Sequence, residues 1–490
     1  MPRKKTTNKP KKEKITKPLA KVKIKPEIIK PAKPTSIPQL LRGMKDILPV
    51  DMVYWRWIKK KAEDLADYFC YQFIETPILE MRDLFIRSVG KQTDIIEKEM
   101  YTFVDPGGET VCLRPEATAS IVRAYINHGM LNLPQPVKFF YFGPMFRHDR
   151  PQAGRFRQFH QAGFEIIGDE HPINDAELIL IAYSFFQDLN LPVTIQLNSI
   201  GCETCRNTYR NELQNYYKTK RGLICNTCKE RLARNPLRLL DCKEPGCELV
   251  KEGAPQMLNY LCESCHTHFF KVIEYLDDLN FPYVLNPYIV RGLDYYSRTV
   301  FEIWPNKSQV KSSEGLKNQT SLATKKNNEN GKKSQELEEE SGLKSQISLC
   351  GGGRYDKLVE ILGGRPTGAA GFAIGVERVI THIKECGLTL LTPSLPQVFI
   401  AQLGESTRRK ALALYNLLQG KVKTAAALSK DGLKAQLEIA NRLGVRYTLI
   451  IGQKEVLDET IIIRDMEAGI QEIVPYNKVL DDLKRRLSLT

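Results

Sequence analysis

The stretch Lys138–Gly168, KFFYFGPMFRHDRPQAGRFRQFHQAGFEIIG, holds two strand-like runs on either side of a charged connection. Lys138–Phe146 and Arg155–Gly168 contain the aromatic and branched residues that favour strands. The connection Asp149–Gly154 includes Pro and Gly, which commonly mark turns. The stretch therefore predicts a long β-hairpin.

One face of the second hairpin strand has an unusual composition. Residues two apart on a strand share a face. A cation, an aromatic ring, an amide and a carboxylate should therefore point to the same side, with a gap where a glycine has no side chain. Core faces are apolar, so we predict that this face covers a ligand, and that the gap at Gly163 lets a small molecule approach. The alternative is a solvated sheet face. The five residues are Arg157, Phe159, Gln161, Gly163 and Glu165.

Length and composition set the outer limits. The 490 residues suggest about three domains, and 42% hydrophobic with 26% charged residues is typical of a soluble globular protein. No apolar run approaches the roughly 18–20 residues that a membrane span needs, and no signal peptide is evident. We therefore expect no membrane association and a cytoplasmic, bacterial setting.

The net charge of +15 is concentrated at the N-terminus. Residues 1–35 hold thirteen Lys and Arg against two Glu, which leaves only +4 for the remainder. We predict that residues 1–36 form a disordered basic tail, either a nucleic-acid-binding arm or a solvated extension. Residues 305–346 lack aromatics and should form a disordered insert between strands at Leu293–Trp304 and Ile347–Cys350.

Helical and strand patterns place the other elements. Asp51 should cap a helix that follows Pro49, Phe73–Leu79 suits an edge strand, and Leu178–Leu189 should be helical. The C-terminal part alternates strands and helices, which predicts a small α/β domain. Its expected strands are Val398–Leu403, Tyr447–Gly452 and Thr460–Asp465, and its expected helices are Thr407–Leu418, Leu433–Leu443 and Tyr476–Leu487.

Eight of the twelve cysteines lie between positions 202 and 265. Paired thiols with two residues between them, in a chain without a signal peptide, favour metal binding over disulfides. Eight thiols could form two four-ligand sites, with the pairing left open and His266 and His268 as rival ligands. Residues 200–280 should form a small inserted domain. The candidate ligands are Cys202, Cys205, Cys225, Cys228, Cys242, Cys247, Cys262 and Cys265.

Five segments together resemble a known enzyme family. Residues 146–152 with 154–161 resemble motif 2 of class II aminoacyl-tRNA synthetases, and more narrowly that of the histidyl-tRNA synthetase family. GFAIGVER at 371–378 resembles motif 3, and Glu75-Thr76-Pro77 resembles motif 1, the dimer-interface element. RGLDYYSRTVFE at 291–302 and GGGRYD at 351–356 resemble the histidine-specific signatures. The similarity covers roughly residues 40–490 apart from the insert.

The resemblance implies an α+β fold and a homodimer. The catalytic core would be an antiparallel β-sheet flanked by helices, built from residues 37–199, 281–304 and 347–392. The Cys-rich insertion at 200–280 would contact the tRNA acceptor arm, and residues 396–490 would be an α/β anticodon-binding domain.

The implied activity is histidine–tRNA ligation. The family joins histidine to ATP, releases pyrophosphate and transfers the histidyl group to the 3′-terminal ribose of tRNA(His), with Mg²⁺ on the ATP. The resemblance makes Arg147 and Arg291 the catalytic cations at the α-phosphate, a role for which preorganised cations are suited. It also places Phe159 under the adenine, Gly375 beside the nucleotide and Arg378 at the γ-phosphate.

The resemblance likewise assigns the histidine pocket. Glu165 and Tyr296 would contact the imidazole, which needs one acceptor and one donor. Arg150, Gln152 and Arg157 would reach the acceptor stem of the tRNA. Zinc is not implied, because many members of the family lack these cysteines, and a structural zinc is our own hypothesis. The remaining histidine-binding residues would be Tyr355 near the ring, Glu116, Thr118 and Gln161 at the amino group, and Arg291 and Tyr295.

Three other interpretations compete with the ligase. The regulatory subunit of ATP phosphoribosyltransferase shares the catalytic fold, but generally lacks the anticodon-binding domain and has degraded catalytic signatures. Residues 397–490 and intact Arg147, Arg291 and Arg378 argue for the enzyme instead. A synthetase for proline or threonine disagrees with the 291–302 signature, and a zinc-ribbon nucleic-acid binder explains only 200–280.

Overall fold

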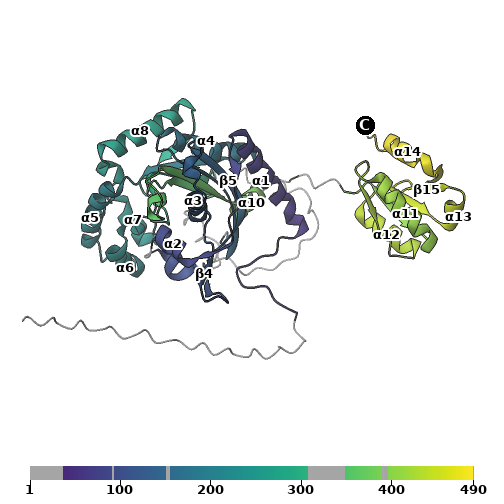
Figure 1. The fold of residues 1–490 in the computed structure, drawn as a ribbon, viewed down its shortest axis with the longest axis horizontal. Helices are drawn as coiled ribbons and strands as arrows, with labels where there is room; N and C mark the ends of the chain where they lie inside the picture. The colour runs from purple at the N-terminus through teal and green to yellow at the C-terminus, as the bar shows by residue number, and fades with distance from the viewer. Residues whose placement is uncertain are drawn as a thin grey trace, which may run out of the picture. The chain divides into compact units, whose positions relative to one another are not determined.

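The computed structural model describes residues 37–90, 93–149, 155–306, 348–388, 390 and 395–488 (Figure 1). The predicted tail at 1–36 and nearly all of the predicted insert lie outside these residues. The start of the insert needs a correction, because Pro305 belongs to a strand and pairs with Val193. Proline is tolerated there since it stands at the end of its strand.

An eight-stranded sheet forms the core of the catalytic part (Figure 1). The six central strands pair antiparallel with one another. Each of the two edge strands pairs in parallel with the strand beside it. The predicted fold class is confirmed. In spatial order the strands are β1 (Gln72–Phe73), β5 (Val137–Phe146), β6 (Gln158–Ile167), β11 (Ala369–Gly375), β10 (Cys350–Arg354), β9 (Ser297–Pro305), β7 (Val193–Ser199) and β8 (Tyr283–Leu285).

The predicted hairpin is confirmed as β5 and β6, which pair from Val137↔Ile167 to Phe146↔Gln158. Alternate residues of its strands enter two separate cores because successive side chains point to opposite faces. Phe140 and Phe164 pack on one face with α1 (Pro49–Tyr68), α4 (Ile173–Asp188) and α10 (Val376–Glu385). The other face packs against α3 (Thr118–Asn127) and α9 (Leu358–Ile361), and the candidate site lies there.

Helix α1 does not begin as expected. Pro49 is its first residue and Leu48 stands at the N-cap, so Asp51 lies in the first turn and caps nothing. Proline suits the first helical position because its φ is already helical and its missing N–H is not needed there. Asp51 instead accepts a hydrogen bond of 2.6 Å from Lys384 of α10.

A smaller sheet lies beside the core, in the order β2 (Leu79–Met81), β4 (Thr110–Leu113) and β3 (Thr102–Val104). The expected edge strand at 73–79 is divided between β1 and β2, because Pro77 interrupts it and cannot donate to a ladder. The elements α2 (Arg82–Val89), η1 (Ile95–Glu99) and η2 (Met130–Asn132) complete this region.

The insertion is helical and has a core of its own. Its elements are α5 (Glu203–Thr219), α6 (Asn226–Arg234), η3 (Pro236–Leu239), α7 (Pro245–Glu252), η4 (Met257–Tyr260) and α8 (Glu263–Asp278). The cysteines pack in this core with Tyr209, Leu213 and Tyr217. The second half of α8 joins the catalytic core instead, through Phe269, Val272 and Leu276.

The C-terminal part has the predicted α/β character, with a five-stranded sheet where three strands were expected. The expected strands and helices are found, except that the last helix opens as the 3₁₀ turn η7 (Tyr476–Lys478). The sequence missed β13, β16 and α13, which are short or exposed. The strands are β13 (Thr424–Ala426), β12 (Val398–Gln402), β14 (Tyr447–Ile451), β15 (Thr460–Asp465) and β16 (Gln471–Pro475), and the helices are α11 (Glu405–Leu418), α12 (Leu433–Leu443), α13 (Gln453–Leu457) and α14 (Val479–Arg486).

Within the part of the chain that the structure describes, every helix is too short or too polar to cross a membrane.

Candidate active site

A cavity of about 350 Å³ opens over the site face of the large sheet. Its walls come from β6, β9, β10, β11 and the segment that precedes β9, which lie far apart in the sequence. Most of the predicted site residues meet there. The predicted residues that line it are Glu116, Thr118, Arg147, Phe159, Gln161, Arg291, Tyr295, Tyr296, Gly375 and Arg378.

Glu165 lies behind the wall of this cavity, with only 1% of its surface exposed. Its carboxylate accepts a hydrogen bond from Thr118 Oγ1 at 2.6 Å and another from the Tyr355 hydroxyl. Gly371 makes room for it, because a Cβ at that position would collide with the carboxylate. Burial raises the pKa of Glu165 to about 8, although both hydroxyl donors lower it.

The expected ligand face of β6 is shorter than predicted. The strand begins at Gln158, so the alternation of side chains does not extend to Arg157. The side chain of Arg157 lies against Gly43 and its backbone N–H donates to the Gly43 carbonyl at 2.8 Å. Gly163 also differs from our expectation, because the Tyr141 ring occupies the space beside it. The gap therefore accommodates a protein side chain and not a ligand.

Two acceptors, Glu116 and Gln161, line the cavity. Glu116 is buried and accepts hydrogen bonds from the Tyr295 hydroxyl at 2.6 Å and from the backbone N–H of Ala119 at 3.2 Å. Glu116 thus binds a backbone N–H in the first turn of α3, and the same carboxylate lines the cavity. Burial raises its pKa. Gln161 Oε1 is buried with no hydrogen-bond partner among the described residues.

Guanidinium groups also line the cavity. Arg147 donates to the Pro115 carbonyl at 2.9 Å and lies 5.3 Å from the centre of the Phe159 ring. Arg291 donates to Glu302 at 2.5 Å, and Gly351 leaves space for its guanidinium.

Arg378 donates to the Ser348 carbonyl at 2.9 Å. Burial and the nearby cations Arg155 and Arg147 lower the pKa of Arg378. Such mutual repulsion is relieved when an anion binds between the cations. The cavity therefore offers cations to a polyanion and acceptors to a cation.

Sequence reasoning missed several residues of the cavity wall. Arg155 pairs with Asp149 at 3.1 Å and lines the cavity. A charged residue of a loop gives no distinctive signal in the sequence, so its place in the cavity was not predicted. Glu377 accepts from the backbone of His160 at 2.9 Å and so ties α10 to β6. Arg238 and Asp241 come from the insertion, and only the tertiary structure brings them to the cavity. Arg150 and Gln152 lie outside the described residues.

A family model for histidyl-tRNA synthetase matches residues 43–312, more than half of the chain. The chain belongs to the histidyl-tRNA synthetase family. An anticodon-binding domain model matches residues 397–486. The predicted family and the predicted enzyme class, an aminoacyl-tRNA synthetase, are confirmed.

Curated relatives and a solved structure are similar to this synthetase over nearly its whole length. The histidine–tRNA ligase of Caldicellulosiruptor bescii is 38% identical over 92% of this chain and 99% of that protein. The ligase of Desulforudis audaxviator is 42% identical over 91% of this chain and 98% of its own length. The crystal structure of apo histidyl-tRNA synthetase from S. aureus has a TM-score of 0.69 at 32% identity, covering 91% of this chain and 100% of that one. The synthetase interpretation is favoured over the regulatory subunit.

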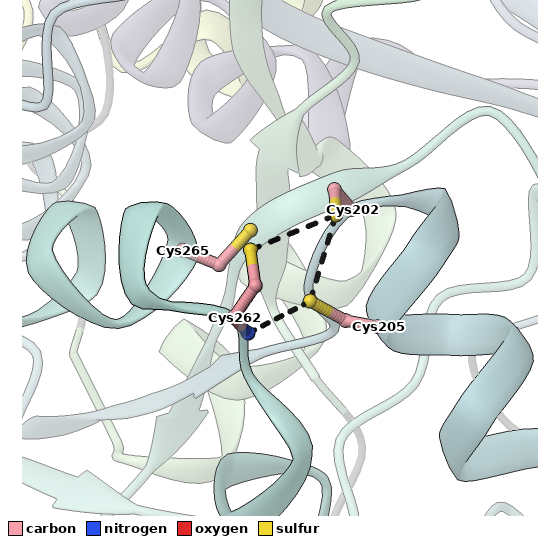
Figure 2. Close-up of side chains that lie close together, drawn as sticks. All are labelled: Cys202, Cys205, Cys262 and Cys265. Atoms are coloured by element: carbon pink, nitrogen blue, oxygen red, sulfur yellow. Dashed lines mark hydrogen bonds between the residues drawn. The ribbon is translucent and has the colours of Figure 1, made fainter.

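The cysteines form two groups of four, which resolves the open pairing. Each group has its sulfur atoms within 4.8 Å of one another. Figure 2 shows the first group, where Cys202 lies 3.5 Å from Cys205 and 4.0 Å from Cys262. Neither rival histidine joins a group: His268 bonds Asp175 at 2.8 Å and His266 stacks on Phe270. The groups are Cys202, Cys205, Cys262 and Cys265, and Cys225, Cys228, Cys242 and Cys247.

The raised pKa of Glu165 predicts how stability changes with pH. Its ordinary pKa is 4.5 and its folded pKa is about 8, so between these values the folded protein binds a proton that the unfolded chain does not. This contribution is fully present below the unfolded pKa and is lost as the pH rises through 8. From about pH 5 to pH 8 the thermal midpoint of the parent should fall more steeply than that of Glu165→Gln. Circular dichroism melts measure both slopes, and parallel slopes would contradict the assignment.

Proposed function

We propose that this synthetase activates histidine with ATP and then transfers the histidyl group to the 3′-terminal ribose of tRNA(His). The observation that supports this best is that one cavity is lined both by the acceptors Glu116 and Gln161 and by the guanidinium groups of Arg147, Arg291 and Arg378. The amino acid fits the first and the triphosphate fits the second. The roles given to individual residues below are part of the proposal.

The imidazole of the substrate is recognised by hydrogen bonds. Near neutral pH the ring has one N–H donor and one bare nitrogen. Glu165 and Tyr296 supply the acceptor and the donor, and Tyr355 orients the carboxylate of Glu165 by donating to it. A ring without the N–H would lose this hydrogen bond, and a site built to bind a polar group rejects analogues that lack it. This explains selectivity for histidine.

The amino group of the substrate is a cation and needs acceptors. Glu116, held by Tyr295 at 2.6 Å, supplies the charge, and the unpartnered Gln161 Oε1 supplies a neutral acceptor. The Thr118 hydroxyl lies beside them and also donates to Glu165. Amino group and ring are therefore bound through one connected set of side chains.

Activation is the attack of the substrate carboxylate on the α-phosphorus of ATP. The new bond joins a carboxylate oxygen to the α-phosphorus, and the bond to the bridging oxygen of pyrophosphate breaks. Arg147 and Arg291 stabilise the negative charge that develops, because guanidinium forks match phosphate oxygens. Arg378 binds the γ-phosphate, Phe159 stacks under the adenine, and Gly375 lets the nucleotide approach the backbone.

Mg²⁺ arrives with the ATP. Among the described residues, the groups arranged to hold a metal are the two cysteine clusters, and thiolates are poor ligands for Mg²⁺. Glu302 lines the cavity, but its oxygens accept hydrogen bonds from Arg291 and from Trp304 Nε1. The triphosphate oxygens are thus the main ligands of the ion, whose charge neutralises the departing pyrophosphate.

Contacts with the tRNA are expected in two places. Arg150, Gln152 and Arg157 are our candidates for the acceptor stem, since cationic side chains suit a phosphate backbone. Residues 397–486, which match the anticodon-binding family, are the candidate for the anticodon.

A homodimer is also part of the proposal. The segment that resembles motif 1 adjoins exposed apolar side chains at Phe73, Leu79 and Met81, and Phe103 and Val104 of β3 are exposed as well. Apolar side chains gathered in this way commonly mark a protein interface. The cytoplasmic setting inferred from the sequence stays a prediction.

We further propose that each cysteine group holds one structural zinc ion. Four sulfurs bound tetrahedrally at about 2.3 Å from zinc lie about 3.8 Å apart. The measured separations of 3.5 Å for Cys202–Cys205, 4.0 Å for Cys202–Cys262 and 3.9 Å for Cys225–Cys242 fit this value. All eight cysteines are free of disulfides.

The zinc proposal has a direct measurement. Elemental analysis of the purified full-length chain should find two zinc ions per chain, and Cys228→Ser should lower this to about one because only its own group is broken. A metal-free parent, or a variant that loses no zinc, would contradict the proposal.

The ligase proposal is tested by ATP–pyrophosphate exchange. Exchange should be driven by histidine and by no other natural amino acid, and tRNA(His) should then be charged. Exchange driven by proline or threonine, or none with histidine, would overturn the proposal.

A further inference from the structure

The segment Arg291–Tyr296 contains three of the residues to which we assign substrate contacts, yet it has neither helix nor strand. Its residues Arg291, Tyr295 and Tyr296 line the cavity. Backbone without a ladder of its own hydrogen bonds needs partners from elsewhere to keep one conformation. Its carbonyl oxygens find such partners in the insertion.

Two arginines of the insertion bind this segment from outside. Arg238 Nη2 donates to the Gly292 carbonyl at 2.7 Å. Arg206 Nη1 donates to the Tyr296 carbonyl at 2.8 Å, with the Asp294 carbonyl at 3.4 Å. Both ends of the segment are thus fixed by charged donors, which form stronger hydrogen bonds than neutral donors do.

Each arginine is joined to one of the cysteine groups. Arg206 follows Cys205 directly in α5, and Figure 2 shows how the first group links α5 to the start of α8. Arg238 belongs to η3, and the backbone N–H of Cys242 in the second group donates to the carbonyl of Leu239 in the same turn at 3.2 Å.

The second group also adjoins the cavity itself. Asp241 precedes Cys242 in the chain, and it lines the cavity together with Arg238. The cysteines of this group come from four places between 225 and 247, so an ion there would fix the whole turn from η3 to α7.

We propose that Arg206 and Arg238 are positioning residues, through which the two metal-holding cysteine groups of the insertion keep Arg291–Tyr296 in its substrate-binding conformation. The inference rests on the proposed zinc sites and on the proposed histidine pocket. The insertion then does more than contact tRNA. Its metal ions set the affinity for the amino acid in the first step, before any tRNA is present.

The first experiment compares Arg206→Ala and Arg238→Ala with Arg234→Ala, an exposed arginine at the end of α6. In histidine-driven exchange by the full chain, the first two should each raise the KM for histidine about tenfold, the size expected for one charged hydrogen bond. The KM for ATP should change less than threefold, and Arg206→Lys should recover part of the loss. Arg234→Ala should behave like the parent.

Hydrogen–deuterium exchange supplies a readout that is independent of activity. Amides of residues 291–296 should exchange faster in Arg206→Ala and Arg238→Ala, while zinc content stays at the parent value. Removing zinc from the parent with a chelator should produce the same local increase. In the double variant, zinc removal should add less than a threefold change in KM, because the route from metal to segment is already cut.

The outcomes separate this inference from the proposals beneath it. If the parent contains no zinc, the metal link falls together with the zinc sites. If zinc is present but the variants change neither the deuterium exchange of residues 291–296 nor the KM for histidine, this inference alone is overturned. If an amino acid other than histidine drives ATP–pyrophosphate exchange, the ligase proposal is overturned. Faster deuterium exchange in the variants would still support the positioning contacts.

Discussion

Replacing Arg291 by alanine should lower histidine-driven ATP–pyrophosphate exchange by about three orders of magnitude or more. The guanidinium lines the cavity and is held by Glu302 at 2.5 Å, so it is oriented before the substrate arrives. A preorganised donor at a developing charge accounts for about 10²–10³ in rate. Arg291 also serves the carboxylate that attacks, which increases the expected loss. Steady-state exchange gives kcat and the KM values separately.

Two controls decide whether the loss comes from catalysis. Circular dichroism and zinc content of Arg291→Ala should match the parent, because Glu302 keeps the hydrogen bond from Trp304 Nε1 when the guanidinium is removed. Arg291→Lys should recover only part of the rate, since an ammonium keeps the charge but lacks the planar fork. Exchange within tenfold of the parent in Arg291→Ala would remove Arg291 from the chemical step.

Replacing Glu116 by glutamine should raise the KM for histidine by about two orders of magnitude. The change keeps the shape of the side chain and its bond to Tyr295, but it removes the charge that faces the amino group of the substrate. Breaking one partner of a buried charge pair costs about 3–5 kcal/mol. Because the proposal places Glu116 at the amino group of histidine and the arginines at the phosphates, the KM for ATP should stay within about threefold.

A substrate analogue provides the matched comparison for Glu116. Imidazolepropionic acid has the ring and the carboxylate of histidine but lacks the amino group. It should inhibit exchange equally in the parent and in Glu116→Gln, whereas histidinol, which retains the amino group, should inhibit the variant much less. If both analogues lose affinity together, Glu116 shapes the pocket and does not bind the amino group.

The sequence alone identified the hairpin, the cysteine pairs and most of the cavity. Strand periodicity and turn residues are local signals, so β5 and β6 were placed within a few residues. The same holds for the C-terminal strands and helices with strong apolar patterns. The resemblance then supplied roles for Arg147, Arg291 and Arg378, which composition could not have assigned.

Two predictions were wrong because a rule about local sequence was applied beyond the segment for which it holds. Arg157 shares the parity of Phe159 and Gln161, but the strand starts at Gln158, and alternation says nothing about where pairing ends. The gap at Gly163 was real, yet a pattern along one strand cannot reveal that Tyr141 from its neighbour occupies it.

Tertiary structure decided which distant groups share a site. Spacing marked the two-residue cysteine pairs, but only folding showed that Cys202 and Cys205 meet Cys262 and Cys265, some sixty residues on. It likewise brought Arg206 and Arg238 to the carbonyls of the 291–296 segment. Local preferences are properties of a few neighbouring residues and can be read in order. Contacts between segments depend on how all the apolar faces pack at once, which no single stretch of sequence specifies.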